Sequence, residues 1–351
     1  MILHRARAVR ASAWTLSLLC LALVLGAVAA APLQTTPTPS TLPAVFEKTA
    51  PGNLDDLRAI QKHVKQLVEK VRPCVVGIIV GEAQGSGVLV SADGHVLTAG
   101  HVSGKPDREC RIILPDGKVL KGKTLGRNIG IDSGMVKITE KGQWPFVEMA
   151  DSSTLKKGNW CLSLGHPGGY HEGRSPVVRL GRILDRNRFQ LKSDCTLVGG
   201  DSGGPLFDME GKVIGIHSRI GGGITDNIHV PVNTYRETYA RLSKNDEWGG
   251  RIIGSPMSEA WMGFQVDKTS KACKIDKVEK DSPAEKFGLK KGDVITRFDN
   301  QQVDSFDDLL YWLLNKKPEE EVAVEVNRDG EKLSLKIKLG KRAANYSPLP
   351  L

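Results

Sequence analysis

The sequence predicts a mainly β protein, in which two small closed barrels are followed by a small α+β domain. Short β-type runs separated by Gly, Asp and Asn extend from Pro73 to about Leu242. Many short strands with frequent turns are typical of barrels and sandwiches, and this span is long enough for two small barrels. A polar, Gly-containing stretch at 243–257 predicts a linker to a second unit, 258–340, where strand-like runs flank one helical run.

Composition and charge limit the classes of partner. The chain has 351 residues, which suits two or three compact units, and a formal net charge of +9. Arg5, Arg7 and Arg10 supply three of these charges from a segment that we expect to be removed. The other basic residues are interspersed with acids and form no long Lys/Arg run, so we expect a mildly basic surface and no nucleic-acid partner.

The N-terminal segment, residues 1–31, has the pattern of a secretory signal peptide. Three arginines precede an uncharged stretch that ends in the small residues Ala27-Val28-Ala29. The alternative is an uncleaved membrane anchor, because about 20 apolar residues can span a bilayer. We therefore expect an exported protein, periplasmic or otherwise extracytoplasmic, which is attached to a membrane only if this segment stays uncleaved.

Residues 32–72 are predicted to form a linker and an N-terminal helix. The part from 32 to 52 is rich in Pro and Thr, which favours an extended chain. Asn53 can cap a helix that carries apolar residues from Leu54 to Val71 on one face. Such a stripe usually packs on the parent domain, and its spacing also suits association between subunits.

The clearest runs give the order of the elements that follow. In the first unit, 73–242, the strand-like runs are Val75–Val80, Gly87–Val90, Arg111–Leu114, Met135–Ile138, Trp160–Leu164 and Lys212–Ile216. In the second unit they are Gly263–Val266, Val294–Phe298, Val322–Val326 and Leu333–Ile337, with a helical run at Phe306–Leu314. The tail, 341–351, is expected to be disordered.

The cysteines predict neither a disulfide framework nor a metal site. Five follow the N-terminal segment, namely Cys74, Cys110, Cys161, Cys195 and Cys273. They are scattered and odd in number, without a C-x-x-C pair, so we expect most of them to be small buried core residues, although an oxidising compartment would permit a bridge.

A Gly-rich segment, Gly200-Asp201-Ser202-Gly203-Gly204-Pro205, carries the strongest chemical signal. A serine hydroxyl is a poor nucleophile unless a base takes its proton and donors stabilise the oxyanion that follows. We assign the oxyanion donors to the backbone N–H groups of Gly200 and Ser202. The alternative, a hairpin turn with an incidental serine, fails once a base and an acid are found in the expected order.

The predicted base and acid are His101 and Asp132. His101 follows an apolar strand and the small residues Ala99-Gly100, and Asp132 precedes another strand-like run. The carboxylate would hold the imidazole tautomer and stabilise the imidazolium. The order His…Asp…Ser is that of the chymotrypsin group, so these three residues predict serine endopeptidase catalysis.

With these motifs, the chain resembles the HtrA/Deg serine proteases from about Val68 to Leu339. The matching blocks are Val68–Val76, Gly85–Val102, Asp132–Ile138, Trp160–Pro167 and the PDZ pattern Asp281–Ile295. The resemblance implies a chymotrypsin-like double β-barrel protease domain followed by one PDZ domain. It also implies an ATP-independent endopeptidase, without a cofactor, that degrades unfolded extracytoplasmic proteins or clips one regulatory substrate, and it suggests homotrimers.

Asp201 departs from the family pattern, which has Asn before the nucleophile. Digestive trypsin-like enzymes use an acid there to bind a new amino terminus, but no activation site of that type lies near Val75. Because a buried, unpaired carboxylate is costly, Asp201 must find another donor, or the oxyanion hole is not fully formed at rest. Because the family has Asn at this position and no activation terminus is found, Asp201→Asn is expected to leave activity unchanged or raise it. If the oxyanion hole is not formed, the protein would be a protease-silent PDZ scaffold or holdase, and this alternative stays open.

The substrate pocket is predicted to be neutral. The position about six residues before the serine selects Arg or Lys when it is acidic, and here it is Thr196. We therefore expect cleavage after small aliphatic residues, as the resemblance also implies. Ser218-Arg219-Ile220 is expected to form the strand that pairs with the substrate backbone.

Two further motifs concern ligands. Trp261-Met262-Gly263-Phe264 resembles the PDZ loop whose backbone N–H groups receive a C-terminal carboxylate, and the alternative is a packing strand with no ligand. His166 and His171 flank a Gly-rich turn, but no acid or cysteine converges on them with metal-ligand spacing. We expect a solvent-exposed loop there and no metal.

Overall fold

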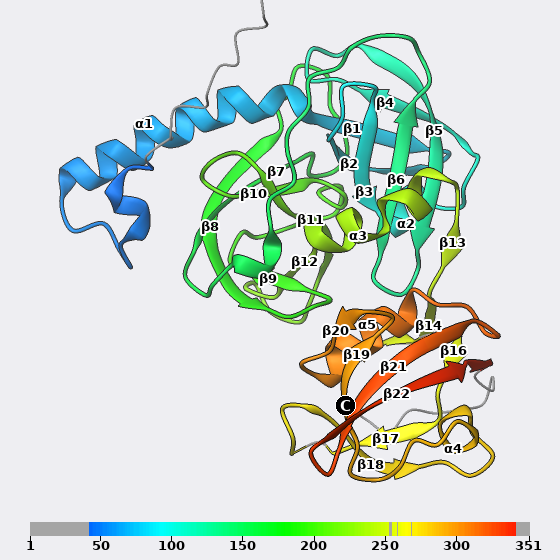
Figure 1. The fold of residues 1–351 in the computed structure, drawn as a ribbon. Helices are drawn as coiled ribbons and strands as arrows, with labels where there is room; N and C mark the ends of the chain where they lie inside the picture. Colours follow the sequence, from blue (N-terminus) through cyan, green and yellow to red (C-terminus); the bar gives the residue numbers. More distant parts are fainter. Residues whose placement is uncertain (1–41, 253–254, 258, 268, 342–351) are drawn as a thin grey trace, which may run out of the picture. The chain divides into compact units, whose positions relative to one another are not determined.

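The computed structural model describes residues 42–252, 255–257, 259–267 and 269–341 (Figure 1). The predicted signal peptide or anchor at 1–31 and the tail after residue 341 lie outside this part. Of the helices that it contains, none is both long and apolar enough to cross a membrane.

Six antiparallel strands close the first barrel, in the order β5-β4-β1-β2-β3-β6 with β5 paired to β6. Their bounds are β1 (Val75–Val80), β2 (Ala83–Leu89), β3 (His95–Ala99), β4 (Glu109–Ile113), β5 (Val119–Asn128) and β6 (Ser133–Ile138). The apolar strand β1 is buried along nearly its whole length and pairs with both β2 and β4. In β5, exposed or half-buried residues alternate with buried ones, because successive side chains of a strand point to opposite faces.

The second barrel is closed by six more strands, in the order β10-β11-β12-β9-β8-β7. Their bounds are β7 (Trp160–Gly165), β8 (Val177–Arg186), β9 (Leu191–Ser193), β10 (Pro205–Phe207), β11 (Val213–Ile220) and β12 (Asn227–Pro231). A 3₁₀ turn, η3 (Ser152–Thr154), precedes it. The two predicted barrels are therefore present, although β8, β9, β10 and β12 were not among the predicted strand-like runs.

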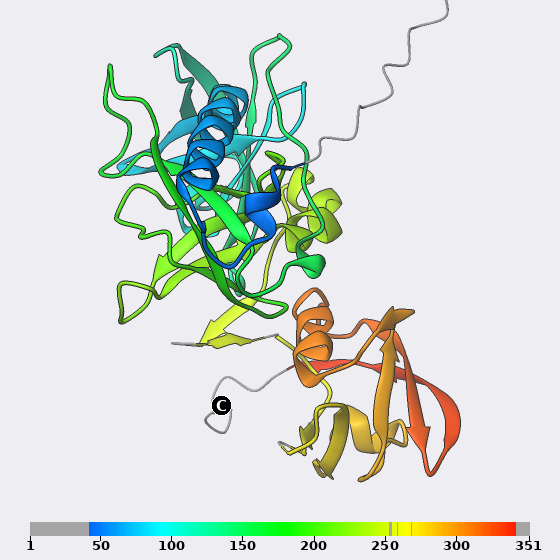
Figure 2. The same ribbon diagram turned by 90° about the vertical axis from the view of Figure 1, so that its left-hand side faces the viewer.

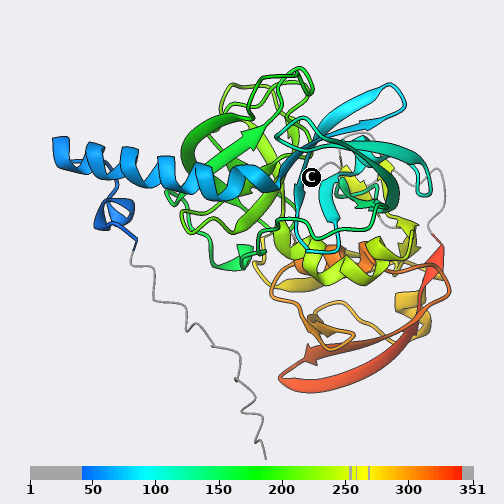
Figure 3. The same cartoon turned by 90° about the horizontal axis from the view of Figure 1, so that it is seen from above.

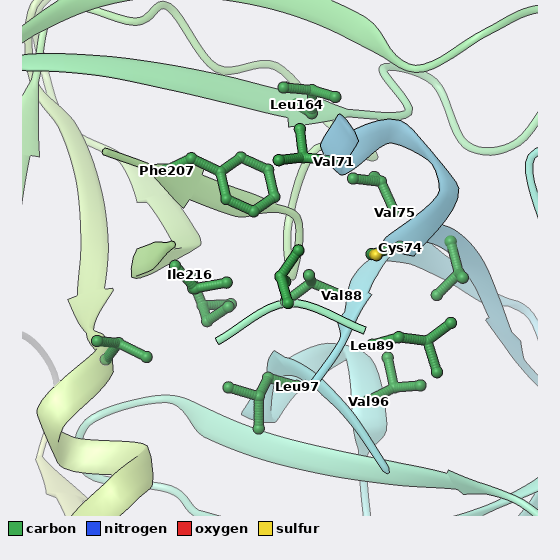
Figure 4. Packing of buried hydrophobic residues seen from close by; sticks show 14 of the residues in the cluster. Val71, Cys74, Val75, Val88, Leu89, Val96, Leu97, Leu164, Phe207 and Ile216 are labelled. Atoms are coloured by element: carbon green, nitrogen blue, oxygen red, sulfur yellow. The ribbon is translucent and has the colours of Figure 1, made fainter. Parts of the chain in front are cut away.

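One hydrophobic core joins the two barrels. Figure 4 shows Val88 and Leu97 of the first barrel gathered with Leu164, Phe207 and Ile216 of the second, and all five are fully buried. Burial of apolar surface stabilises by roughly 25 cal/mol per Å². Residues from both barrels can therefore form one site, because a shared hydrophobic core holds the barrels together.

The helix predicted after Asn53 is confirmed as α1 (Leu54–Val71). The Asn53 side chain accepts a hydrogen bond of 2.9 Å from the Asp56 N–H, as an N-cap residue should. Three apolar residues of the stripe are buried, namely Ile60, Leu67 and Val71. The first turns extend past the barrels (Figure 3), and Leu54 and Leu57 are more than half exposed. The stripe thus packs on the parent domain mainly through its C-terminal half, from which η2 (Arg72–Cys74) leads into β1.

The extended linker predicted for 32–52 is wrong in its last part. Ala44–Glu47 forms a 3₁₀ turn, η1, beside α1 (Figure 2). Val45 and Phe46 are buried, and the Phe46 ring meets the Trp160 ring edge-on at 5.8 Å between centroids. Burial of these two apolar side chains holds the Pro-rich stretch against the folded protein.

The segment after the second barrel also differs from the prediction. Helix α3 (Val232–Ser243) was not predicted, and its buried Tyr235 donates a hydrogen bond of 2.8 Å to the carbonyl of Thr98 on β3. Within the predicted linker 243–257, β13 (Glu247–Trp248) pairs in parallel with β5, so this pair of residues belongs to the first barrel's sheet. The hairpin β14 (Gly250–Ile252) and β15 (Ser255–Met257) follows.

The second unit is a small α+β domain with its own hydrophobic core. Its sheet has the order β17-β18-β19-β21-β22, with β20 beside β19. The strands are β16 (Ala260–Trp261), β17 (Phe264–Val266), β18 (Cys273–Val278), β19 (Val294–Phe298), β20 (Gln301–Gln302), β21 (Glu321–Arg328), β22 (Glu331–Lys338) and β23 (Gly340–Lys341), where β16 pairs with β23. The helices are α4 (Pro283–Lys286) and α5 (Phe306–Leu314), and α5 has the predicted bounds.

Candidate active site

His101 and Asp132 lie side by side at one edge of the first barrel. His101 belongs to the short helix α2 (Gly100–Ser103) after β3, and Asp132 lies in the turn before β6. The His101 Nδ1 atom is 2.9 Å from Asp132 Oδ2, and the His101 N–H donates a hydrogen bond of 2.9 Å to Oδ1. Asp132 has a φ of 63°, a left-handed conformation that Asp tolerates. Backbone and side chain together thus fix this pair.

Ser218 connects this pair to Ser202. The Ser218 hydroxyl donates a hydrogen bond of 2.6 Å to Asp132 Oδ2. Its carbonyl oxygen lies 3.4 Å from the Ser202 Oγ, which donates to it. The sequence predicted Ser218 as part of the substrate pocket, but its side chain is turned to the acid of the predicted triad.

The environment favours an ionised Asp132. Burial raises the pKa of this carboxyl, but the hydrogen bonds and charge of His101 and the hydrogen bond from Ser218 outweigh burial, and the pKa is lowered below 3.8. The His101 side chain is 51% exposed, whereas that of Asp132 is 15% exposed. A fixed anion behind an exposed imidazole can stabilise an imidazolium that forms during proton transfer.

The turn that carries Ser202 is held from the first barrel by Ser86 on β2. The buried Ser86 donates from its N–H to the Ser202 carbonyl at 2.8 Å and from its Oγ to the Gly200 carbonyl at 2.9 Å. Gly200 has a φ of 92°, which only glycine adopts readily. Within residues 42–252, neither the Gly200 N–H nor the Ser202 N–H donates to a protein acceptor. The role of Ser86 was not predicted; its position between Gly85 and Gly87 is the signal in the sequence that could have pointed to it.

Asp201 has the donor that the sequence analysis required. It is Arg179 on β8, whose Nη2 lies 2.9 Å from Asp201 Oδ2 and whose Nη1 lies 3.3 Å from Oδ1. The Val198 N–H donates to the same Oδ2 at 3.0 Å. Burial raises the pKa of Asp201, and Val198 and Arg179 oppose that rise. Sequence reasoning missed Arg179 because β8 was not predicted.

The predicted substrate-binding residues lie along β11 and the segment before Ser202. Thr196 is exposed, and Ile220 is 49% exposed. Arg219 and Ile220 pair with β12, whereas the pairing of β11 with β10 ends at Ile216. The predicted substrate segment 218–220 thus lies beyond the end of the β10–β11 pairing.

The loop after β7 corrects one prediction. His166 is fully buried, so it does not lie in a solvent-exposed loop, whereas His171 is exposed. Burial, aided by the charge of Arg174, lowers the pKa of His166 to about 4. In the part of the chain that the structure describes, no group of three or more His, Cys, Asp or Glu residues could hold a metal ion.

The predicted carboxylate loop precedes β17. Gly263 has a φ of 86°, and a Cβ atom there would lie 2.2 Å from the Ser282 Cβ, so glycine is required. The Met262 carbonyl accepts from the Ala284 N–H at 2.7 Å, and the Gly263 carbonyl accepts from the Glu279 N–H at 2.9 Å. β17 is the terminal strand of its sheet and pairs only with β18 among the described strands. Its other edge is where an added peptide strand could pair.

Comparison with known proteins assigns both units. The model of the trypsin-like peptidase domain matches residues 85–216, and that of the PDZ domain matches residues 260–339. Two relatives that match this chain are described as probable periplasmic serine endoproteases, DegP-like. The one from Marinomonas sp. (strain MWYL1) is 33% identical over 270 residues, covering 74% of this chain and 57% of the relative. The one from Pseudomonas putida (strain GB-1) is 30% identical over 311 residues, covering 84% and 65%.

The chain therefore carries a trypsin-like peptidase domain and one PDZ domain, and it is similar to DegP-like serine endoproteases. It spans less than two thirds of the length of these relatives. Among solved structures, an HtrA-type protease AlgW with a tripeptide superposes with a TM-score of 0.60 at 24% identity, covering 82% of this chain and 98% of that one. This likeness supports the predicted fold, a trypsin-like double barrel followed by one PDZ domain.

Proposed function

We propose that this protein is an exported serine endopeptidase of the HtrA/Deg kind. The observation that carries the proposal is that Asp132 bonds to His101 and, through Ser218, is connected to Ser202. The turn around Ser202 has two N–H groups, those of Gly200 and Ser202, that donate to no protein acceptor among the described residues. In the proposed reaction, Ser202 Oγ attacks the peptide carbonyl carbon as His101 takes its proton. The N–H groups of Gly200 and Ser202 stabilise the oxyanion.

The remaining steps return the enzyme to its starting state. The C–N bond breaks as His101 gives its proton to the leaving amine, which leaves an acyl group on Ser202. Water then attacks this ester as His101 takes a proton from it. The bond between the acyl carbon and Ser202 Oγ breaks, His101 gives the proton to Oγ, and the carboxylic acid leaves. Asp132 stays ionised throughout, in keeping with its lowered pKa.

We propose unfolded or C-terminally exposed polypeptides as substrates. The uncharged Thr196, and the end of the β10–β11 pairing at Ile216, support an extended segment with a small aliphatic residue before the cleaved bond. Export is supported by the pattern at 1–31 and by the periplasmic description of the relatives. Homotrimers and membrane attachment through an uncleaved N-terminus remain part of the proposal, and light scattering and N-terminal sequencing of the exported protein test them.

Labelling of Ser202 tests the proposed activity. The wild-type protein should react with a fluorophosphonate and cleave unfolded casein, and Ser202→Ala should lose both, because a methyl group cannot attack a carbonyl. Peptide binding and the circular dichroism spectrum of the variant should not change. A folded wild-type protein that does not react would instead support the protease-silent scaffold or holdase.

A further inference from the structure

We propose that Arg179 is a positioning residue, which holds the turn 198–203 and its oxyanion donors through a buried ion pair with Asp201. This inference rests on the proposed function, because the donors matter only if an oxyanion forms. Arg179 contacts the Asp201 carboxylate. It acts through the residue that directly precedes the nucleophile.

The geometry of the pair is that of a directional contact. Both terminal nitrogens of Arg179 face the Asp201 carboxylate, at 2.9 and 3.3 Å. The Asp201 side chain is fully buried, and that of Arg179 is 19% exposed. A two-point contact between a guanidinium and a carboxylate fixes orientation as well as distance, which a single Lys ammonium does not do.

The same carboxylate closes the turn. Asp201 Oδ2 accepts a hydrogen bond from the Val198 N–H, and the Asp201 N–H donates to the Val198 carbonyl at 3.1 Å. The Gly204 N–H donates to the Asp201 carbonyl at 2.9 Å. Gly200 and Ser202 are the neighbours of Asp201 on either side, so a shift of Asp201 moves both proposed donors.

The second barrel leaves room for the pair. On the β7–β8 ladder, Arg179 lies opposite Ser163, a small residue. A Cβ atom at Gly165 would lie 2.6 Å from Asp201 Oδ1, so any larger residue there would displace the carboxylate. The small residues Ser163 and Gly165 of β7 therefore leave space for the contact between Arg179 of β8 and Asp201.

The charge balance explains why one partner cannot be removed without cost. Removing one member of a buried ion pair leaves the other charged and desolvated, which costs more than the intact pair gains. The predicted tolerance of Asp201→Asn assumed that no cation was present. With Arg179 in contact, loss of the carboxylate should loosen the turn. The pair also supplies from β8 the cation that a new amino terminus supplies in digestive trypsin-like enzymes.

The experiment uses the full-length protein with Arg179→Met, Arg179→Lys, Asp201→Asn and the double variant Arg179→Met/Asp201→Asn. Arg186→Met is the matched control, because Arg186 lies on the same strand but bonds to the Leu155 carbonyl. Two quantities are measured: amide hydrogen exchange of the peptide that spans 198–203, and the second-order rate of reaction with a fluorophosphonate. The first does not require an active enzyme.

We expect Arg179→Met and Asp201→Asn each to speed exchange in 198–203 and to slow labelling by about ten- to a hundredfold, since loss of one oxyanion donor has at least that effect. Steady-state assays should show the loss in kcat rather than in KM. The double variant should be little worse than either single variant. Arg179→Lys should recover part of the rate, and Arg186→Met should match the wild type.

Two outcomes overturn the inference, and they differ from failure of the proposed function. Unchanged exchange and unchanged labelling in Arg179→Met would show that the turn does not depend on the pair. Additive losses in the double variant would show that the two residues act separately. If the wild-type protein itself does not react, the proposed function fails, and the exchange measurement still decides whether Arg179 orders the turn.

Discussion

At the scale of single residues, two side chains converge on the Asp132 carboxylate. His101 and Ser218 both approach Oδ2, at 2.9 and 2.6 Å. These two contacts thus fix the orientation of the Asp132 carboxylate. A hydrogen bond to a charged group typically contributes about 1.5–3 kcal/mol, so the Ser218 hydroxyl should matter for turnover.

Ser218→Ala should lower kcat by roughly 10- to 100-fold, which corresponds to that energy range. The fold should be retained, because only one oxygen atom is lost. Peptide hydrolysis at neutral pH measures the effect. Ser153→Ala is the matched control, since its hydroxyl also donates a 2.6 Å hydrogen bond to a carboxylate, that of Asp151. Equal activity of Ser218→Ala and the wild type would mean that the Asp132 orientation does not depend on Ser218.

Thr196 should decide which residue precedes the cleaved bond. The wild-type protein should cleave after Val or Ala, because an uncharged side chain at this position cannot pair with a cation. Thr196→Asp should shift cleavage towards Arg and Lys, and Thr154→Asp, at another exposed threonine, should not. A peptide library analysed by mass spectrometry measures both. Arg-dominated cleavage by the wild type would refute the neutral pocket.

At the scale of elements, a buried chain of hydrogen bonds crosses the second barrel. Ser163 on β7 bonds to His217 on β11 at 2.9 Å, His217 to His229 on β12 at 2.9 Å, and His229 to Ser193 on β9 at 2.7 Å. Burial lowers the pKa of His229 to about 3. Burial lowers the pKa of His217 well below its usual value, and repulsion from Arg179, and from His229 when that ring is protonated, lowers it further. Both rings are therefore neutral in the folded protein at neutral pH.

The two buried, neutral histidines predict that the protein loses stability in acid. An unfolded His binds a proton below about pH 6.5, whereas the folded rings do not, so the unfolded state takes up more protons as the pH falls. Below pH 6.5, the free energy of unfolding should decrease by up to about 1.4 kcal/mol per pH unit for each ring. For His229 this decrease should end near pH 3, where the folded ring also binds a proton.

Urea unfolding between pH 7 and pH 4 tests this dependence. His229→Gln should reduce the slope, because one of the two rings no longer titrates. The exposed His171→Gln should leave the slope unchanged. If His229→Gln and the wild type show the same slope, the buried rings do not account for the acid sensitivity.

The terminal strand β17 should bind peptides by their free C-terminus. The carboxylate would lie against the N–H groups around Met262, Gly263 and Phe264, with the peptide paired to β17. The apolar side chains of Met262 and Phe264 favour a terminal Val, Leu or Phe over Asp or Lys. Calorimetry with matched peptides checks this, and equal affinity for free and amidated forms would exclude carboxylate capture.

At the scale of the whole molecule, the described chain has two separate large hydrophobic cores. The double barrel and the second unit each bury their own cluster. Holding a substrate on the same chain raises its effective concentration at Ser202, to the millimolar range for short linkers. A protein with both units should thus favour long substrates.

Deletion of residues 258–351 should lower kcat/KM for long unfolded substrates more than for short peptides. The reason is that only a long chain can engage both units at once. Casein and a short fluorogenic peptide, assayed side by side, measure the difference, and the short peptide serves as the internal control. An equal loss for both would point to an allosteric effect of the second unit on the oxyanion turn.

Local sequence was sufficient where the signal lies within a few residues. Asn53 and the apolar stripe after it predicted α1, and the run Phe306–Leu314 predicted α5 with its bounds. The segment Gly200–Pro205 and the order of His101, Asp132 and Ser202 pointed to one kind of chemistry. These inferences hold because capping, periodicity and turn formation depend on near neighbours.

The contacts that complete the site were decided by the tertiary structure. Ser86 reaches Gly200 across 114 positions, Ser218 reaches Asp132 across 86, and Arg179 reaches Asp201 across 22. No local pattern marks such pairs, because closure of the two barrels on a common core brings them together. The sequence by itself therefore determined the predicted chemistry and the order of the domains. The tertiary structure decided which donors orient Asp132, pair with Asp201 and shape the turn around Ser202, since burial and charge pairing depend on the packed state.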